Sequence, residues 1–393
     1  MIVLSCLAGL IAAVLLLPTL SDLISVVTVA TRRVTPRRGS SEALPRLLFL
    51  VPAHDEEALI ASCLESLRSM RYPEDRLARW VVADNCSDQT ARIARAAGAT
   101  CLERHVPTLP GKPHAIAWAM ERLPLQDFDA VVIVDADIVV DPQFARGLAR
   151  AHPMRGKVVQ PQNNVRNPGD NALTRMAAVL SAANHHLAFG LKNRAELNVP
   201  LSAGMTVGTD VLARHKWPAF SIGEDWELYA ILTEQGVRTE SAPEAHLFAE
   251  EARSLEQSAT QRHRWAAGKL TVLARYAPKL VASRQIAWRQ KLDALAELSS
   301  LGPAVHLGLV GVLVTALLLA RAPLAVSLVG ALGLSLARMA LYAAVAVSQE
   351  RHPWKTALAF SYLPFYTLWR LGVQLTALTM LGDKPWIRTQ RNR

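Results

Sequence analysis

Residues 131–141 read VVIVDADIVVD, an apolar run that is interrupted by two carboxylates one residue apart. The first part, Val131–Val134, has no polar alternation, which is typical of a parallel strand buried on both faces. Asp135 and Asp137 then fall at the carboxyl end of that strand, where open α/β sheets bind ligands. Hard divalent cations bind through one or two carboxylates together with substrate phosphates. The stretch therefore predicts a cation–diphosphate site, unless both acids only cap the following turn.

Two apolar runs that precede this stretch share its character. LLFLVPA at 47–53 and WVVADN at 80–85 read as buried strands, and helices are expected to begin near Asp55, Ser87 and Lys112. Strands that alternate with helices predict a doubly wound, mostly parallel α/β sheet of the nucleotide-binding type. No GxGxxG or GxxxxGK[ST] follows these strands, which argues against a dinucleotide cofactor and a P-loop.

The composition narrows the possible partners. The 393 residues are 51% hydrophobic and 19% charged, with a net charge of +10, which suits nucleic acid, an anionic membrane or an anionic substrate. The expected strand ends carry acids and no basic stripe, so nucleic acid is not an expected partner. The four cysteines lack CxxC spacing, which argues against zinc and disulfides and favours a reducing compartment.

The first 31 residues carry one charged side chain, Asp22, and are long enough to span a bilayer. Four arginines follow at once: Arg32, Arg33, Arg37 and Arg38. By the positive-inside rule they place the next domain in the cytoplasm. A cleaved signal peptide is the alternative, but no basic region precedes the apolar run. We therefore expect an amino-terminal transmembrane helix.

The carboxyl-terminal quarter returns to the membrane. Residues 299–320 carry no Asp, Glu, Lys or Arg, and residues 323–348 carry only Arg338, so both stretches can span. A charge inside a span is costly, so Arg338 is a functional candidate that should face a polar partner or cavity. A further full crossing over 356–381 would break the positive-inside rule, which favours an interfacial or re-entrant element there. The expected organisation is a membrane helix (1–31), a cytoplasmic domain (46–285), a membrane region (299–381) and a basic tail (382–393).

Six short motifs stand in order over about 215 residues: VPAHDEE (51–57), DNCSDQT (84–90), GK (111–112), DAD (135–137), GED (223–225) and QRHRW (261–265). Each is weak alone, but the set resembles the membrane-bound family-2 glycosyltransferases, which share the GT-A fold and include polysaccharide synthases and ceramide-glucosyltransferase-like enzymes. The resemblance implies inverting transfer of a sugar from a nucleotide donor, with UDP as the carrier and Mg²⁺ or Mn²⁺ as cofactor.

The resemblance also implies a donor pocket at the strand ends. The first motif would line the uracil and ribose, although Asp55 stands where the family commonly has Asn, and acids there also suit a helix start. Asp84 resembles the family's acid that hydrogen-bonds the uracil, and Asn85 would shape the loop after it. Lys112 resembles the family's lysine near the nucleotide phosphates. The expected donor-binding residues are Pro52, His54, Glu56, Asp84, Asn85, Lys112 and Asp135.

The DAD and GED motifs divide the chemistry. By resemblance, Asp137 is the direct metal ligand and Asp135 contacts ribose or metal, so that the cation offsets charge growing on the departing diphosphate. Asp225, next to Glu224, is implied as the base that deprotonates the acceptor hydroxyl, which requires hydrogen-bond distance. From the residues alone, an acidic pair at the start of a surface helix is the simpler explanation.

The QRHRW motif lies in an expected helix that starts near Leu255. By resemblance, Gln261, Arg264 and Trp265 lie by the acceptor and diphosphate, with Trp265 as a platform for the sugar and Arg264 as a cation for phosphates. The alternative is a basic juxtamembrane helix, with Arg262, attracted to anionic lipid.

The acceptor stays open at this stage. The QxxRW motif favours processive polysaccharide synthesis. The two or three expected carboxyl-terminal membrane elements are few for a polymer channel, and this small number fits a lipid or short oligosaccharide acceptor equally well. A catalytically silent membrane subunit is the alternative from another class. The tail motif KPWIRTQR (384–391) resembles a WxRTxR ending that would lie near the active site. We expect a multi-pass protein of the plasma (inner) membrane whose cytoplasmic domain takes a nucleotide sugar and a lipid or glycan acceptor.

Overall fold

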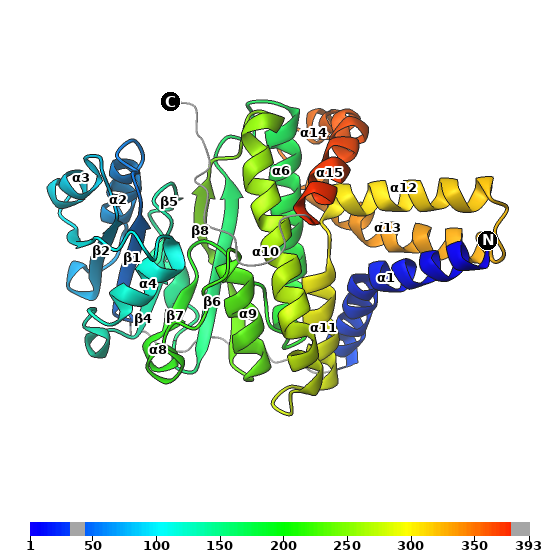
Figure 1. The fold of residues 1–393 in the computed structure, drawn as a ribbon. Coiled ribbons are helices and arrows are strands. Elements are labelled where there is room, and N and C mark those ends of the chain that lie inside the picture. The colour runs from blue at the N-terminus through cyan, green and yellow to red at the C-terminus, as the bar shows by residue number, and fades with distance from the viewer. Residues whose placement is uncertain (32–43, 379–393) are drawn as a thin grey trace. The chain divides into compact units, whose positions relative to one another are not determined.

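The structure, a computed structural model, describes residues 1–31 and 44–378 (Figure 1). The chain divides into two compact units. The sheet unit comprises Val34–Arg166 and Asn198–Glu251, and the helical unit comprises Met1–Arg33, Asn167–Leu197 and Ala252–Arg393. The tail motif at 384–391 and the arginines that follow residue 31 lie outside the described residues.

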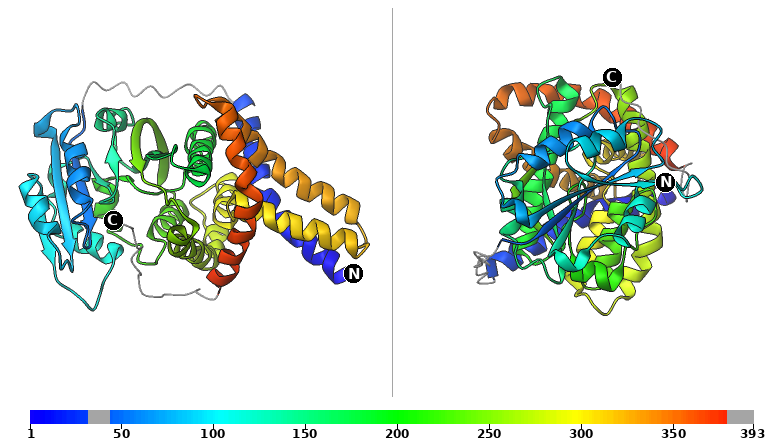
Figure 2. Two further views of the ribbon diagram at one scale, coloured as in Figure 1. Left: turned by 90° about the horizontal axis from the view of Figure 1, so that it is seen from above. Right: turned by 90° about the vertical axis from the view of Figure 1, so that its left-hand side faces the viewer.

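A mixed sheet forms the core of the sheet unit, and Figure 2 shows its strands side by side. The described residues give eight strands in the order β3-β2-β1-β4-β7-β6-β8-β5. Four are parallel neighbours: β1 (Leu47–Ala53), β2 (Leu77–Asp84), β3 (Thr100–Arg104) and β4 (Ala130–Ile133). The others are β5 (Val139–Val140), β6 (Lys157–Val165), β7 (Thr206–Gly208) and β8 (Arg238–Ala249). β7 runs antiparallel to β4 and β6, and β5 antiparallel to β8, while β6 and β8 are parallel. The predicted mostly parallel α/β sheet is confirmed, with an antiparallel part added.

The central strands explain why the site lies where it does. Every residue of β1 and β4 is buried, which accounts for their continuous apolar sequence. Ala53, the last residue of β1, pairs in register with Ala83, and Leu50 pairs with Ile133. The carboxyl ends of β1, β2 and β4 therefore meet at one edge of the sheet.

The helices of the sheet unit begin where local backbone geometry allows. They are α2 (Ile60–Arg68), α3 (Thr90–Ala96), α4 (Lys112–Met120), α5 (Phe144–Ala149), α8 (Thr209–His215) and α9 (Glu224–Glu234), with 3₁₀ turns at Glu74–Arg76 and Leu125–Asp127. α4 begins at the predicted residue. The predicted starts near Asp55 and Ser87 are wrong by a few residues. Asp55 has φ of 50°, in the left-handed region that helices exclude. Asn85, also with φ of 50°, opens a loop in which the Asp88 carboxylate accepts the Thr90 N–H at 2.9 Å, and α3 begins at Thr90.

The helical unit is built from long helices. They are α1 (Ile2–Thr31), α6 (Ala172–Ala182), a π-helix (Ala183–Ala188), α7 (Phe189–Arg194), α10 (Leu255–Ala282), α11 (Trp288–Ser299), α12 (Pro303–Leu319), α13 (Ala325–Ser348), α14 (Pro353–Ala359), a 3₁₀ turn (Phe360–Tyr362) and α15 (Leu363–Leu378). α1, α12 and α13 lie side by side (Figures 1 and 2) and share an apolar cluster that includes Leu15, Leu317 and Leu332.

Length and hydropathy make α1 and α13 candidate membrane spans. α12 alone is shorter, and it forms a third candidate only together with α11, from which it is bent by 82°. The segment 356–381, for which we predicted an interfacial or broken element, consists of most of α14, a 3₁₀ turn and all of α15, and residues 379–381 lie outside the described residues. It is not among the candidate spans of the described residues.

Arg338, the one charge in α13, has the polar partner that its position demands. Its Nε lies 2.5 Å from an oxygen of Asp22 in α1, and the Tyr342 hydroxyl donates to the same oxygen at 2.6 Å. The Arg338 and Asp22 side chains are only 17% and 13% exposed. The two charges that the sequence places in separate apolar stretches therefore neutralise each other, which gives Arg338 a structural role in joining α1 to α13.

Removing one partner of the Asp22–Arg338 pair should lower the stability of the protein more than removing both partners. Arg338→Met or Asp22→Leu leaves one charge buried without its partner, and each should lower the free energy of unfolding by about 3–5 kcal/mol. The double variant should recover most of that loss. The measurement is the Tm of the detergent-purified protein, and additive losses in the double variant would show that the pair is not coupled.

Candidate functional site

Three charged side chains from different elements meet in the sheet unit. The ammonium of Lys112, the first residue of α4, lies 2.6 Å from Asp135 and 2.9 Å from Glu224. The three side chains are 25%, 32% and 14% exposed, so the cluster is shielded but not sealed. Lys112, Asp135 and Glu224 are all predicted site residues, and the first and last are more than a hundred positions apart in the sequence. The two contacts of Lys112 bring them together.

Local backbone chemistry sets Lys112 in place. Gly111 precedes α4 with φ of 108°, a conformation that only glycine adopts readily, and Pro113 occupies the first turn, where its missing N–H costs nothing. Burial lowers the pKa of Lys112, but the charges of Asp135 and Glu224 outweigh burial and raise it overall. The lysine therefore carries a fixed positive charge between two acids.

Asp225 follows Glu224 in the first turn of α9, whose predicted start after Gly223 is confirmed. Burial raises the pKa of the Asp225 carboxyl, and the charge of Glu224 raises it further. Lys112 and the Trp226 N–H, which donates to Asp225 at 2.8 Å, act in the opposite direction. The resulting pKa of about 7 suits a group that accepts a proton near neutral pH.

Glu227, which the sequence analysis missed, holds the chain that leads into α9. Its side chain is 3% exposed and accepts hydrogen bonds from the backbone N–H groups of Phe220 at 2.8 Å and Ser221 at 2.6 Å. The only sequence signal is a third acid in the first turn, which reads as a simple complement to the helix dipole. Glu227 thereby fixes the position of the Glu224–Asp225 pair.

The DAD residues have the exposure pattern of a ligand pair. Asp135 and Asp137 are partly exposed, whereas Ala136 between them is 4% exposed, so both carboxylates avoid the core. Burial raises the pKa of the nearby Cys63 thiol, and the charges of Asp137 and Asp135 raise it further. Asp141, by contrast, accepts the Gln143 N–H at 2.7 Å and caps the following turn. The DAD pair therefore offers the oxygen donors that a hard divalent cation takes together with substrate phosphates.

A second group of possible ligands lies at the ends of β1 and β2. Among the described residues, Asp55, Cys86 and Asp88 gather their ligand atoms within 4.8 Å of one another. These acids already serve the loops around them, since Asp55 accepts the Ser87 N–H at 2.7 Å and Asp88 accepts the Glu57 N–H at 3.0 Å. We therefore assign this group to loop structure.

The expected uracil-binding acid, Asp84, is held by protein partners. Its carboxylate lies 2.5 Å from Arg104, accepts the Gly111 N–H at 3.3 Å, and is 5% exposed. Arg104 at the end of β3 was missed, because nothing in a single edge strand marks its side chain as a partner of β2. His54 Nδ1 hydrogen-bonds the Asp84 carbonyl at 2.7 Å, and Asn85 accepts the backbone N–H of Val106 at 2.7 Å. The network joins the strand end to the loop before α4.

The remaining donor residues lie in the first motif. Pro52 is buried within β1, and the Glu56 N–H donates to the Thr90 hydroxyl at 2.8 Å. This contact ties the loop after β1 to the start of α3.

The QRHRW motif lies on α10 in the helical unit, and the predicted helix start at Leu255 is confirmed. Ser254 caps the helix by accepting the N–H of Gln257 at 3.2 Å. The Trp265 side chain is 43% exposed, and the Arg262 guanidinium lies 4.8 Å from its ring centre. Gln261 and Arg264 belong to the same two turns of α10.

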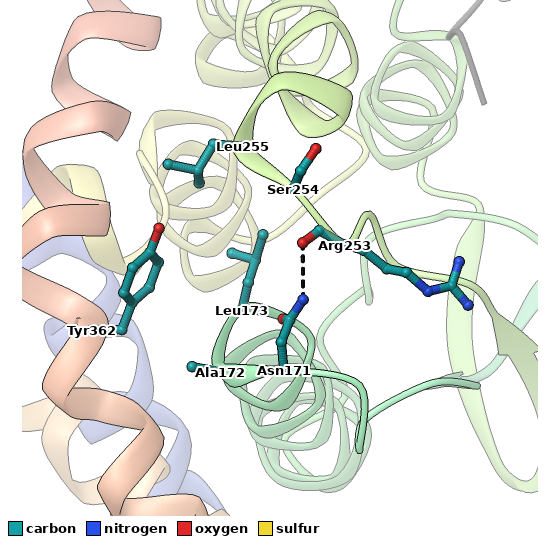
Figure 3. A pocket seen from close by; sticks show the side chains of 7 residues that line it. All are labelled: Asn171, Ala172, Leu173, Arg253, Ser254, Leu255 and Tyr362. Atoms are coloured by element: carbon teal, nitrogen blue, oxygen red, sulfur yellow. Dashed lines mark hydrogen bonds between the residues drawn. The ribbon is translucent and has the colours of Figure 1, made fainter. Parts of the chain in front are cut away.

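A pocket of about 230 Å³ opens in the helical unit, at the start of α6 and α10 (Figure 3). Asn171 donates across it to the Arg253 carbonyl at 2.9 Å, and Tyr362 faces Leu255 and Leu173 from the opposite side. The lining residues are Asn171, Ala172, Leu173, Arg253, Ser254, Leu255 and Tyr362. The pocket combines an apolar wall with backbone polar groups, which suits an amphiphilic ligand.

Comparisons with known proteins agree with this geometry. Residues 45–268 match a family model described as glycosyltransferase like family 2. The probable glycosyltransferase YdaM of Bacillus subtilis is 40% identical over 62 residues, which cover 16% of this chain and 15% of that protein. A beta-monoglucosyldiacylglycerol synthase of Trichormus variabilis is 29% identical over 150 residues, 35% of this chain and 32% of the synthase. The aligned stretches thus span a third or less of these relatives.

A solved structure extends the likeness in fold. The mannosyltransferase PcManGT from Pyrobaculum calidifontis, solved with GDP-Man and Mn²⁺, superposes with a TM-score of 0.59 at 18% identity, over 96% of this chain and 98% of that one. The family match covers more than half of the chain and contains the DAD pair, the Lys112 cluster and α9. On that match the protein belongs to the family-2 glycosyltransferases, and its sheet unit adopts their GT-A fold.

Proposed function

We propose that the protein is an inverting, divalent-cation-dependent glycosyltransferase that moves a sugar from a UDP-sugar to a lipid acceptor at the cytoplasmic face of the membrane. The observation that carries the proposal is the contact of Lys112 with both Asp135 and Glu224, since it gathers the donor-side acids and the acceptor-side acids at one place. Asp225 beside this cluster has the raised pKa that a general base requires.

The donor half of the reaction rests on Asp135, Asp137 and Lys112. The two aspartates would hold Mg²⁺ or Mn²⁺, which supplies Lewis-acid stabilisation of the leaving diphosphate. Lys112 adds a positive charge 2.6 Å from Asp135, so an incoming diphosphate meets a charge that is already oriented. Because Lys112 is anchored by two carboxylates, little reorganisation is needed when the donor binds.

The acceptor half rests on Asp225. Its carboxylate takes the proton of the acceptor hydroxyl, and the oxygen attacks the anomeric carbon of the donor sugar. The bond from that carbon to the diphosphate breaks, and the diphosphate leaves with the electron pair. A single in-line displacement of this kind inverts the anomeric configuration. Glu224 stays fixed by its 2.9 Å contact with Lys112 and keeps Asp225 in position.

Two findings favour a lipid acceptor. The partial relative from Trichormus variabilis is a glycolipid synthase, and α1 and α13 have the length and hydropathy of membrane spans. A growing polysaccharide is the second candidate, because QRHRW at 261–265 resembles the QxxRW motif of processive synthases. A single product supports the first acceptor, and a ladder of products supports the second.

The direct test is nucleoside diphosphate release by the detergent-purified protein with Mn²⁺ or Mg²⁺, across a panel of UDP-sugars. GDP-sugars belong in the panel, because the mannosyltransferase of the same fold was solved with GDP-Man. We expect release from one UDP-sugar that increases when native lipid extract is added. Intact nucleotide binding without release from any donor would instead favour a catalytically silent subunit.

Removal of the base should separate chemistry from binding. Asp225→Asn keeps the size of the side chain but cannot take the acceptor proton, so kcat should fall about 10²–10⁴-fold while the Kd for the nucleotide stays unchanged. Glu234→Gln, in the last turn of the same helix, is the matched control and should retain activity. Normal transfer by Asp225→Asn would show that another group is the base.

Removal of the metal ligand should instead weaken binding. Asp137→Ala should reduce nucleotide affinity in Mn²⁺ to the level that wild-type protein shows in EDTA, because the proposed cation bridge is lost. The measurement is calorimetric titration of UDP with and without Mn²⁺. Asp141→Asn, which alters a nearby acid outside the DAD pair, should keep the dependence on Mn²⁺, and an equal loss in both variants would contradict the assignment.

The pH profile should report Asp225. Its pKa of about 7 lies above the ordinary value, so the carboxyl is protonated and inactive at lower pH. We expect kcat/KM to fall about tenfold per unit below pH 7 and to level off above it. Glu224→Gln removes a charge that raises this pKa, so the midpoint should move to lower pH. A flat wild-type profile between pH 5.5 and 8 would be inconsistent with this base.

A further inference from the structure

Arg370 on α15 has no counter-ion among the residues that the structure describes. Its Nη1 is buried and has no hydrogen-bond partner, and the guanidinium forms no ion pair with any described residue. Buried polar groups are nearly always hydrogen-bonded, and a buried charge without a partner is costly. An arginine in this state is explained if its partner is a ligand.

A second polar group beside Arg370 shares this property. Thr367, one turn earlier on α15, is 6% exposed, and its hydroxyl likewise lacks a hydrogen-bond partner in the part of the chain that the structure describes. Residues three apart lie on one side of a helix. Arg370 and Thr367 therefore present several unused donors from adjacent turns.

A second cation lies close by on α10. Burial lowers the pKa of Arg370, Tyr366 opposes this change, and the charge of Arg262 lowers the pKa further. Arg262 contacts the Ser258 hydroxyl at 3.3 Å and lies over the Trp265 ring, so its position is defined. The charge of Arg262 therefore acts on Arg370 where α10 packs on α15, and an anion bound at Arg370 lies within the field of both cations.

The surroundings on α15 indicate where such an anion comes from. The opposite side of the helix exposes large apolar side chains, with Phe365 57%, Leu368 70% and Leu375 67% exposed. A helix with one apolar exposed side and a cation, Arg370, toward the other has the pattern of an interfacial membrane helix. Lipid phosphates lie at the depth that such a helix occupies.

An apolar path adjoins the cations. Tyr366 stacks on Trp369 at 5.6 Å and packs in one cluster with Leu255 and Tyr362, which line the pocket in Figure 3. Tyr366 and Arg370 are four residues apart and lie on one side of α15, and Tyr362 ends the 3₁₀ turn that leads into this helix. The pocket, the aromatic cluster and Arg370 therefore follow one another along the chain.

We propose that Arg370 and Arg262, with Thr367, form a phosphate-binding site of the helical unit, and that its occupant is the headgroup phosphate of an anionic membrane lipid. Arginine suits this ligand because its planar fork donates two hydrogen bonds to one phosphate. The proposed site belongs to the helical unit, and phosphate binding there does not require the transfer reaction.

The test is the Tm of the full-length protein in detergent. The probes are mixed micelles that contain phosphatidylglycerol, mixed micelles that contain phosphatidylcholine, and inorganic phosphate or pyrophosphate without lipid. A ligand that binds only the folded state raises the Tm, by an amount that grows with the logarithm of its concentration once this exceeds the Kd. We expect phosphatidylglycerol to raise the wild-type Tm by several degrees more than phosphatidylcholine.

The variants make the result specific. Arg370→Gln removes a charge that has no ion-pair partner within residues 1–31 and 44–378, so without lipid its Tm should equal or exceed that of the wild type, whereas the phosphatidylglycerol shift should be lost. Arg370→Lys should keep part of the shift. Arg351→Gln removes the same charge from an exposed position of the helical unit and should keep the whole shift.

Each outcome decides between the alternatives. A shift with pyrophosphate or phosphate alone that is lost in Arg370→Gln would retain the anion site but assign it to a soluble phosphate compound. An equal phosphatidylglycerol shift in the wild type and in Arg370→Gln, or no shift with any probe, would overturn the proposal.

Discussion

The ion pairs of Lys112 with Asp135 and Glu224 are the interaction on which the rest of the site depends. The lysine belongs to α4, and the two acids follow β4 and open α9, so its contacts join all three elements through charge. Four acids of the two motifs would repel one another without it. Lys112 offsets part of that charge, and the remaining negative charge is what makes a divalent cation and a diphosphate favourable occupants.

The same balance of charges gives Glu224 and Asp225 different surroundings. Glu224 reaches Lys112, whereas Asp225 is desolvated next to the Glu224 charge, and its pKa rises to about 7. Two adjacent carboxyl groups thus acquire different tasks from their environments, one positional and one suited to proton transfer. Glu227 contributes indirectly, because its buried carboxylate fixes the loop that aims the pair.

The features that depend on local sequence pattern could be predicted from the sequence. The buried strands, the starts of α4, α9 and α10, and the acids at the end of β4 follow from apolar runs and turn residues. Sequence reasoning did not find Arg104 under Asp84 or Asp22 opposite Arg338, because such pairs depend on which distant elements become neighbours. It also placed α2 and α3 too early, since the left-handed backbone at Asp55 and Asn85 has no clear signal in non-glycine residues.

We propose that one displacement at the Lys112 cluster transfers a sugar from a nucleotide donor to a lipid. The most direct measurement is to supply the purified protein with a donor labelled at its anomeric carbon, together with membrane lipid, and to determine the anomeric configuration of the extracted product by NMR. The account predicts one labelled glycolipid whose configuration is inverted relative to the donor. A product with retained configuration, or label that remains entirely in the aqueous phase as free sugar, would contradict it.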